Sequence, residues 1–151
     1  MSVALRPMRW WDIEPVARVE RVLFVDDAWS DAMFWSELAA RGSRHYVVAE
    51  DDGAVVGYAG LCAYPSGEAY VQTIAVAADR QGAGIGTGLL VELLADADAR
   101  GCAHVDLEVR ADNDAAIRLN ERHGFRRIGV RRHYYQPSGA DAVVMRRERV
   151  R

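Results

Sequence analysis

The sequence of 151 residues contains no lysine, and its 19 basic residues are all arginines. Without lysine no P-loop can contact a nucleotide phosphate through that side chain, which excludes Walker-type ATPases. Schiff-base chemistry is excluded for the same reason, and with it pyridoxal phosphate enzymes and class I aldolases. The missing residue type therefore removes several enzyme classes before any motif is considered.

Cysteine and long apolar runs are also scarce. The two cysteines, Cys62 and Cys102, lie in apolar segments without a CxxC spacing, which is typical of buried thiols in a reduced protein. The N-terminal residues have no signal-peptide core, and no apolar stretch approaches about 18 residues. These features predict a cytoplasmic protein without a membrane span.

Metal, acyl-enzyme and nucleic-acid motifs are lacking too. The four histidines, at positions 45, 104, 123 and 133, have no metal-ligand spacing, and no serine occurs in a GxSxG motif. The arginine-rich residues 146–151 have no interleaved aromatics, so nucleic-acid binding is not expected. We predict a disordered tail over 147–151.

The charges that are present divide unevenly along the chain. Residues 1–99 carry 7 arginines and 15 acidic residues, whereas residues 100–151 carry 12 arginines and 7 acidic residues. Such a division suggests two partners of opposite charge, and an ordinary solvated surface is the alternative.

Hydrophobic periodicity and turn residues predict one domain over 1–151, with element order β-α-α-β-β-β-α-β-α-β-β. We expect an α/β (α+β) fold with a single mixed, mostly antiparallel sheet flanked by helices, in which one crossover helix joins two parallel strands. The predicted strands are 3–5, 45–50, 54–62, 69–76, 102–109, 125–134 and 142–146, and the predicted helices are 13–24, one after Ser30, 87–100 and 113–123.

The first third of the chain also contains predicted helix caps and predicted buried residues. Asp12 and Ser30 are suited to cap the first two helices. Residues expected to be buried or to serve packing are Met33, Phe34, Leu38, Trp10, Trp11 and Trp35.

The most informative segment is the glycine-rich stretch from Gln81 to Thr87, between a predicted strand and a predicted helix. Three glycines in five residues let successive N–H groups point into one concavity at a helix N-terminus, which suits a pyrophosphate. The glycine spacing does not match GxGxxG, so a dinucleotide fold is not indicated. From these residues alone, a tight turn is the alternative.

Several motifs together resemble the GNAT superfamily of N-acetyltransferases, and the resemblance covers nearly the whole chain. They are Thr73-Ile74-Ala75-Val76 followed by Gln-x-x-Gly-x-Gly, the opening Leu5-Arg6-Pro7-Met8, Asn113-Asp114-Ala115-Ala116 and Gly124-Phe125.

The resemblance implies acetyl-CoA as co-substrate and no metal. Ile74, Ala75 and Val76 would hydrogen-bond the pantetheine arm, and the Val76 N–H would polarise the thioester carbonyl. The remaining implied cofactor-binding residues are Gln81, Gly82, Ala83, Gly84, Ile85, Gly86, Thr87 and Asn113.

The segments Leu107–Arg110, Leu119–Phe125 and Arg131–Tyr135 resemble the RimI type within this family, which acetylates the N-terminal alanine of a small-subunit ribosomal protein. The catalytic glutamate of that type falls on Glu108, which would deprotonate the acceptor through water. An α-amine has a pKa of about 8, against about 10.4 for lysine, so a modest base suffices. A solvated acid at a strand edge is the alternative for Glu108.

One position departs from the family pattern. The tyrosine that protonates the leaving thiolate is replaced by Asn120, which cannot transfer a proton near neutral pH. Three explanations are open. Tyr134 or Tyr135 serves as the proton donor instead, Asn120 serves only to orient the thiol, or the change weakens the enzyme. Because a thiol has a pKa near 8.5, we expect reduced rather than absent activity.

The acceptor side has weaker signals. Trp29 and Asp31, with Asp26 and Asp27, would form a groove for a basic protein N-terminus, with a ribosomal protein as the candidate partner and Tyr134 on the other wall. The alternative is an acidic loop around a core tryptophan. The leading prediction is direct acetyl transfer to an N-terminal α-amine in a ternary complex. The alternatives are a GNAT enzyme for lysine or small-molecule amines and a weakly active acyl-CoA-binding regulatory domain. We expect a monomer or weak dimer.

Overall fold

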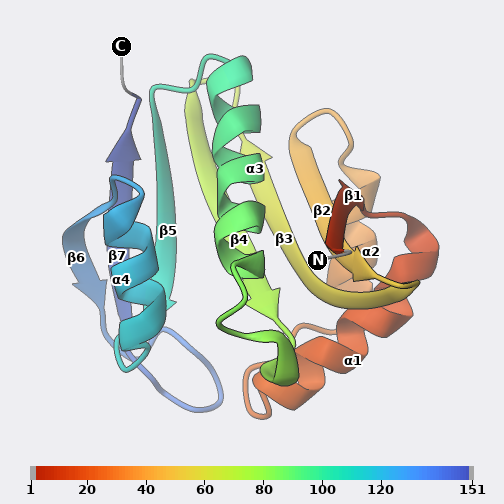
Figure 1. The fold of residues 1–151 in the computed structure, drawn as a ribbon. Coiled ribbons are helices and arrows are strands. Elements are labelled where there is room, and N and C mark those ends of the chain that lie inside the picture. The colour runs from red at the N-terminus through yellow and green to blue at the C-terminus, as the bar shows by residue number, and fades with distance from the viewer. Residues whose placement is uncertain (1–2, 150–151) are drawn as a thin grey trace.

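The computed structural model describes residues 3–149 and has the predicted element order (Figure 1). The strands are β1 Val3–Pro7, β2 Arg44–Asp51, β3 Ala54–Ala63, β4 Glu68–Val76, β5 His104–Arg110, β6 Arg126–Arg131 and β7 Ala142–Glu148. The helices are α1 Ile13–Leu23, α2 Asp31–Ala39, α3 Ile85–Ala99 and α4 Asp114–Arg122, with short 3₁₀ turns at Trp10–Asp12 and Ala78–Arg80.

The strands form one seven-stranded sheet in the order β1-β2-β3-β4-β5-β7-β6. All neighbours are antiparallel except β4 and β5, which are parallel and joined by the crossover helix α3. The predicted mixed, mostly antiparallel sheet is therefore confirmed. The β2–β3 hairpin turns at Asp52 and Gly53, whose positive φ angles of 50° and 83° suit a two-residue turn.

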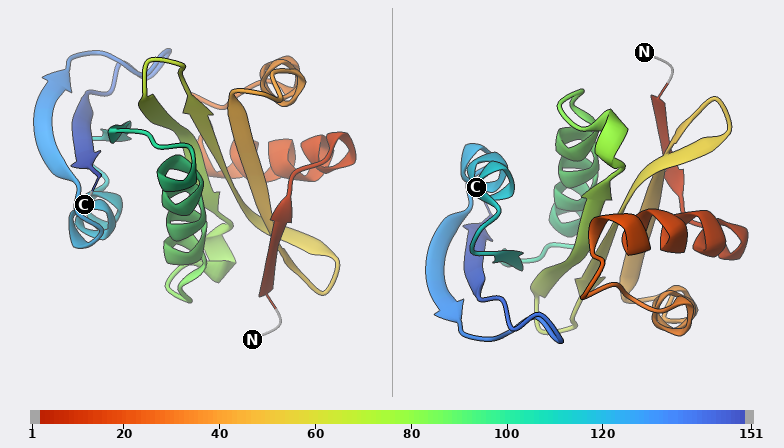
Figure 2. Two further views of the ribbon diagram at one scale, coloured as in Figure 1. Left: turned by 90° about the horizontal axis from the view of Figure 1, so that it is seen from above. Right: turned by 90° about the horizontal axis from the view of Figure 1, so that it is seen from below.

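The helices cover both faces of the sheet, with α1 and α2 on one side and α3 and α4 on the other (Figure 2). Helix α3 buries apolar residues that recur at 3–4 spacing along it: Leu89, Leu90, Leu93, Leu94 and Ala97. On the opposite face Val16 of α1 and Phe34 of α2 pack around Tyr58 of β3, all three with 0% exposure. Each large buried side chain contributes about 1.5–3 kcal/mol to the hydrophobic stabilisation.

Of the two predicted helix caps, one is confirmed. The Ser30 hydroxyl accepts the Met33 N–H at 3.2 Å, as an N-cap does. Asp12 lies inside a 3₁₀ turn with helical backbone angles and makes no side-chain cap to α1. Its carboxylate instead pairs with the Arg6 guanidinium at 2.7 Å, so an ion pair between β1 and the turn replaces the cap.

The expected packing role of three tryptophans is wrong. Trp10, Trp11 and Trp35 are 60%, 55% and 50% exposed, because the 3₁₀ turn and the outer side of α2 present them to solvent. The Trp10 and Trp35 rings stack on each other with centroids 6.1 Å apart. Met33 is also exposed rather than buried, whereas Phe34 is in the core as predicted.

The last two strands end at residues other than those predicted. Strand β7 continues through Arg147 and Glu148, which pair with Val105 and His104, so these two residues do not belong to a disordered tail. Residues 150 and 151 of the predicted tail lie outside the described residues. Strand β6 ends at Arg131, before Tyr134, because the positive φ of 53° at His133 breaks an extended strand.

No helix within residues 3–149 has the length and apolarity needed to cross a bilayer.

Candidate active site

The two parallel strands separate where the site residues lie. Strand β4 pairs with β5 only over Glu68–Val71, opposite His104–Leu107. Beyond this register β4 continues to Val76 and β5 to Arg110, and the two strands diverge in Figure 1. The backbone of residues 72–76 on that side is therefore beyond the last β5 pair, which suits pairing with an extended ligand.

The glycine-rich segment forms the predicted loop at the start of α3. Gly82 and Gly84 have φ angles of 82° and 85°, a region that favours glycine. The first hydrogen bond of α3 runs from the Gly88 N–H to the Gly84 carbonyl at 3.0 Å, so the preceding N–H groups lie at the open helix end. The positive helix end and the exposed, uncharged loop fit a pyrophosphate.

The loop is tied back to the end of β4. The Gln81 side-chain amide donates to the Val76 carbonyl at 3.1 Å, which brings these two predicted residues together. Ala75 is buried, while Ile74 and Val76 are partly exposed. Asn113, another predicted cofactor residue, is the N-cap of α4, where its side-chain oxygen accepts the Ala116 N–H at 3.1 Å.

Glu108 lies on β5 as a largely buried carboxylate, with only 11% of its side chain exposed. The Tyr70 hydroxyl lies 3.5 Å from its Oε1, and the Arg131 Nε lies 3.4 Å from the same oxygen. Burial raises the pKa of Glu108, while Arg131 and Tyr70 partly oppose that rise and Asp106 adds to it. A carboxylate with a raised pKa is better matched to proton abstraction near neutral pH.

Asn120 is 5% exposed in α4, and its amide nitrogen lies 3.8 Å from the Met145 sulfur. Because a thioether sulfur is a weak acceptor, this contact holds the amide only weakly. Tyr134 is 44% exposed, and its ring lies edge-on to that of Tyr135 with centroids 5.1 Å apart. Burial raises the pKa of both tyrosines, so both hydroxyls keep their protons at neutral pH.

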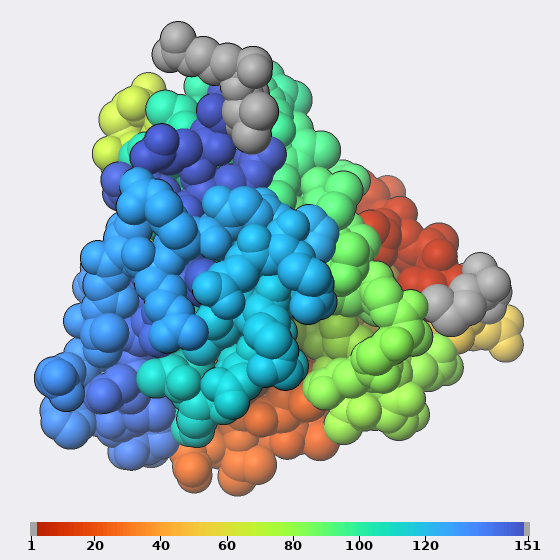
Figure 3. All heavy atoms as spheres, turned by 60° about the vertical axis from the view of Figure 1, so that its left-hand side comes forward, coloured from red at the N-terminus to blue at the C-terminus, as the bar shows by residue number. Residues whose placement is uncertain are grey.

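A side-chain cluster joins the α1–α2 loop to the β6–β7 loop. Asp27 pairs with Arg110 at 2.7 Å and accepts the Ser138 hydroxyl at 2.9 Å. The Arg110 guanidinium also lies over the Tyr135 ring, 5.7 Å from its centroid. Figure 3 shows the two loop regions, orange and dark blue, side by side at the lower edge of the molecule.

The predicted acceptor residues divide between the loop interior and the surface. The Trp29 ring packs on Phe34 with centroids 5.2 Å apart, and its backbone N–H donates to Glu20 at 2.8 Å. Glu20 also accepts the Tyr58 hydroxyl, so a buried carboxylate anchors the loop from below. Asp31 is exposed and pairs with Arg21 at 3.6 Å.

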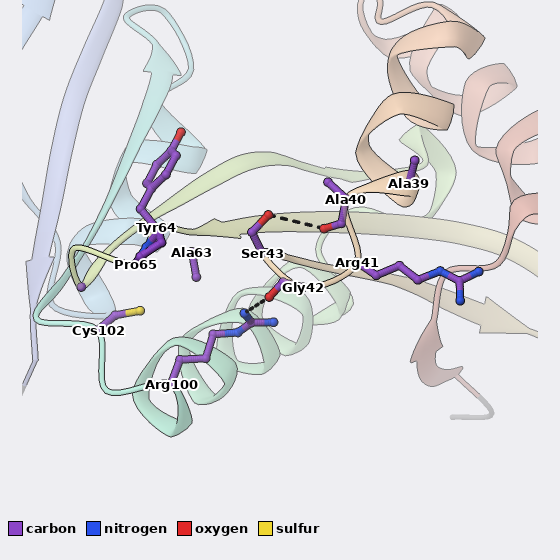
Figure 4. Close-up of a pocket in the computed structure, with 11 residues that line it drawn as sticks. Ala39, Ala40, Arg41, Gly42, Ser43, Ala63, Tyr64, Pro65, Arg100 and Cys102 are labelled. Atoms are coloured by element: carbon purple, nitrogen blue, oxygen red, sulfur yellow. Dashed lines mark hydrogen bonds between the residues drawn. The ribbon is translucent and has the colours of Figure 1, made fainter.

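A cavity of about 680 Å³ lies elsewhere in the molecule (Figure 4). Gly67, which precedes β4, and Cys102, which precedes β5, line it at the opposite end of these strands from Val76 and Arg110. None of the described residues that line it is a predicted site residue. We assign it no part in the site.

Two arginines of the site carried no predicted role. Arg131 and Arg110 contact Glu108, Asp27 and both loop tyrosines. Arginine is so frequent in residues 100–151 that its presence in these strands gave no distinguishing signal. Only the strand register shows which of them reach the candidate site.

Comparison with known proteins agrees with this geometry. Residues 8–125 match the acetyltransferase (GNAT) family. An N-alpha-acetyltransferase RimI of Mycobacterium tuberculosis is 50% identical over 141 residues, which cover 91% of this chain and 87% of that protein. An N-alpha-acetyltransferase of Sulfurisphaera tokodaii is 31% identical over 153 residues, covering 93% of this chain and 90% of that protein.

Among solved structures, the ribosomal-protein-S18-alanine N-acetyltransferase from Escherichia coli superposes with a TM-score of 0.84 and 31% identity. The match covers 97% of this chain and 93% of that one. With a family match over most of the sequence and relatives similar along nearly their whole length, this chain belongs to the acetyltransferase (GNAT) family.

Proposed function

We propose that the protein transfers an acetyl group from acetyl-CoA to the N-terminal α-amine of a protein, in the cytoplasm and as a single domain over residues 1–151. The acceptor is the N-terminal alanine of a small-subunit ribosomal protein. The RimI of M. tuberculosis and the S18-alanine N-acetyltransferase of E. coli support this acceptor through their similarity along most of the chain. The largely buried Glu108, beside the point where β4 and β5 diverge, is the observation that carries the proposal.

Acetyl-CoA would bind with its pantetheine arm along residues 74–76 and its pyrophosphate at residues 81–87. The two left-handed glycines of the loop and the N-terminus of α3 support this placement, because they direct backbone N–H groups outward without any lysine. Asn113 would contact the arm through the amide nitrogen, since its oxygen already caps α4.

The transfer proceeds by direct attack in a ternary complex. Glu108 removes a proton from the acceptor ammonium through water, and the free amine attacks the thioester carbonyl carbon. The Val76 N–H stabilises the resulting oxyanion. The nitrogen, which is positively charged after the attack, loses its second proton to water as the oxyanion collapses, and the C–S bond breaks to release the CoA thiolate. Asn120 can hydrogen-bond that sulfur but cannot donate a proton to it, so the thiolate is protonated by another group or by water.

The acceptor peptide enters between the α1–α2 loop and the β6–β7 loop. Trp29, Asp31 and Tyr134 are our candidates for contacts with it. The acidic residues of the first loop support a basic peptide through charge complementarity. The ion pair of Asp31 with Arg21 must open for Asp31 to take part, and its exposed position makes that inexpensive.

Three acceptors test the proposal: a peptide starting Ala-Arg, the same peptide with a blocked N-terminus and an internal lysine, and spermidine. Each is incubated with acetyl-CoA, and CoA release and product mass are measured. We expect transfer to the free N-terminus only. Transfer confined to the blocked peptide or spermidine would instead support a lysine or small-molecule enzyme, and CoA binding without transfer would support a regulatory domain.

A further inference from the structure

The Arg131 side chain crosses from β6 over β7 to reach Glu108, the proposed base on β5. In the sheet register Arg131 of β6 and Arg110 of β5 both pair with Ala142 of β7. Glu108 precedes Arg110 by two residues, so its side chain is on the same face of β5. The short side chain of Ala142 leaves room for Arg131 to pass over β7 and bring its Nε to 3.4 Å from Glu108.

The two partners of this ion pair differ in exposure. The Arg131 side chain is 54% exposed, whereas Glu108 is 11% exposed. The Arg131 Cζ also lies 5.6 Å from the centroid of the Tyr134 ring, so the guanidinium has a second favourable site next to the first. A half-exposed arginine in such an ion pair is held weakly and can exchange partners at little cost.

We propose that Arg131 is a positioning residue that occupies, in the acceptor-free enzyme, the cation site at Glu108 that the acceptor's α-ammonium takes on binding. The proposal rests on the role of Glu108 proposed above. When the acceptor enters, the Arg131 Nε gives up its contact with Glu108 while the guanidinium keeps its contact with the Tyr134 ring, and the carboxylate pairs with the ammonium instead. Arg131 transfers no proton, because a guanidinium stays protonated in proteins.

The exchange keeps the buried carboxylate compensated at each stage. An ionised carboxylate without a cation is costly to bury, and Arg131 supplies that cation while the acceptor is absent. The other ionisable groups that act on Glu108 are Tyr70 from β4 and Asp106 from β5, with Tyr134 and Tyr135 in the β6–β7 loop. Arg131 is the single cation acting on Glu108 among the described residues.

The pH dependence of two kinetic parameters tests the exchange. The acid limb of kcat/KM for the acceptor reports the free enzyme, in which Arg131 pairs with Glu108, while that of kcat reports the complex. In Arg131→Gln the acid limb of kcat/KM should move to higher pH, because the free carboxylate loses its cation. The limb of kcat should stay in place. Above both limbs the acceptor KM should fall about twofold to fivefold, since no internal cation competes.

Matched variants make the result specific. Arg131→Lys keeps a cation and should keep the wild-type limb. Arg132→Gln removes the neighbouring arginine, which makes no ion pair among the described residues, and should match wild type. The KM for acetyl-CoA should be unchanged in all three variants. The thermal unfolding temperature should be unchanged in Arg131→Lys and Arg132→Gln and slightly lower near neutral pH in Arg131→Gln, in which the buried carboxylate has lost its cation. The acceptor is the Ala-Arg peptide throughout, so the titration of its own amine near pH 8 is common to every profile.

Two results would overturn the inference. If both limbs move together in Arg131→Gln, the arginine stays on Glu108 in the complex. If neither limb moves, the arginine does not act on Glu108. Glu108→Gln separates this inference from the proposed function. A rate close to wild type in Glu108→Gln would show that Glu108 is not the base, which contradicts the proposed function. A large loss of rate in Glu108→Gln, together with an unaltered pH profile in Arg131→Gln, would contradict only the proposed exchange.

Discussion

The two halves of the candidate site differ in whether backbone groups or side chains form them. The cofactor half consists of the end of β4, the glycine loop and the N-terminus of α3, and it offers mainly backbone groups. The acceptor half consists of the α1–α2 loop and the β6–β7 loop, which side chains such as Asp27 and Ser138 hold together. A backbone site needs few side chains, whereas a side-chain site depends on which residues meet.

The difference affects how each half responds to change. Acetyl-CoA is the same molecule for every acceptor, so a site made of glycine conformations and a helix end can serve it without specific side chains. The acceptor varies between enzymes of one fold, and its recognition is placed on loops, which tolerate substitution. Substitutions in the first half should therefore alter the KM for acetyl-CoA, and those in the second should alter acceptor binding and pH dependence.

The largest effect is expected at Asn120, which is buried in α4 and belongs to neither half. Asn120→Tyr places a hydroxyl where the resemblance to the family implies a proton donor, and we expect kcat to rise at least about tenfold, because general acid catalysis contributes about 10²–10⁴-fold. The matched control is Asn120→Phe, which adds similar volume at this buried position without the hydroxyl. Steady-state rates of CoA release measure both variants.

The pair of variants separates chemistry from packing. If the tyrosine and phenylalanine variants have equal kcat values, position 120 is not the site of thiolate protonation. In that case another group or water protonates the sulfur, and Asn120 has a structural role in α4.

The sequence predicts the first half better than the second for a physical reason. Left-handed backbone positions require residues such as Gly82 and Gly84, so the loop leaves a mark in the sequence itself. The sequence predicts that Trp29 lies in the loop between the first two helices, where the structure has it, but the buried Glu20 beneath it joins segments far apart in the chain. Such contacts depend on the sheet register, which periodicity does not supply.

The same limit explains the wrong expectations. Trp10 and Trp35 were expected to pack because large aromatics are usually well buried, yet they stack on each other at the surface. Asp12 has a cap residue's identity and position, but a nearby Arg6 on β1 takes its carboxylate. Strand β7 extends through Glu148 because edge-to-edge pairing with β5 continues past the apolar pattern.

A matched pair of glycines tests the backbone character of the cofactor half. Gly84 and Gly53 have φ angles of 85° and 83°, and a methyl group on either would meet nothing within 4 Å. Each substitution to alanine should lower the free energy of unfolding by about 1–2 kcal/mol through the left-handed conformation alone. Only Gly84→Ala should also raise the KM for acetyl-CoA, by several fold. Equal KM values in the two variants would show that the loop does not hold the cofactor.

The smallest effect is expected at Glu20, the buried carboxylate beneath the α1–α2 loop of the acceptor half. Burial raises the pKa of Glu20, while its hydrogen bonds from Tyr58 and the Trp29 N–H oppose that rise. A carboxyl with a raised folded-state pKa stabilises the fold below its unfolded pKa of about 4.3 and loses that contribution as pH rises through the folded value. Glu20→Gln stays neutral, so its stability relative to wild type should increase between pH 4 and pH 7.

This gain should be less than about 1 kcal/mol, because the ionised carboxylate keeps both hydrogen bonds and only part of its desolvation cost is recovered. Denaturant unfolding across that pH range measures the difference, and Glu14→Gln is the control, since the Glu14 side chain on the same helix is 80% exposed. If both variants follow one pH profile, Glu20 is solvated or already neutral, and the acceptor loop rests on its apolar contacts with Phe34. A divergence confined to Glu20→Gln would mean that protonation beneath Trp29 stabilises the loop that receives the acceptor, a pH dependence that the backbone-built cofactor half does not share.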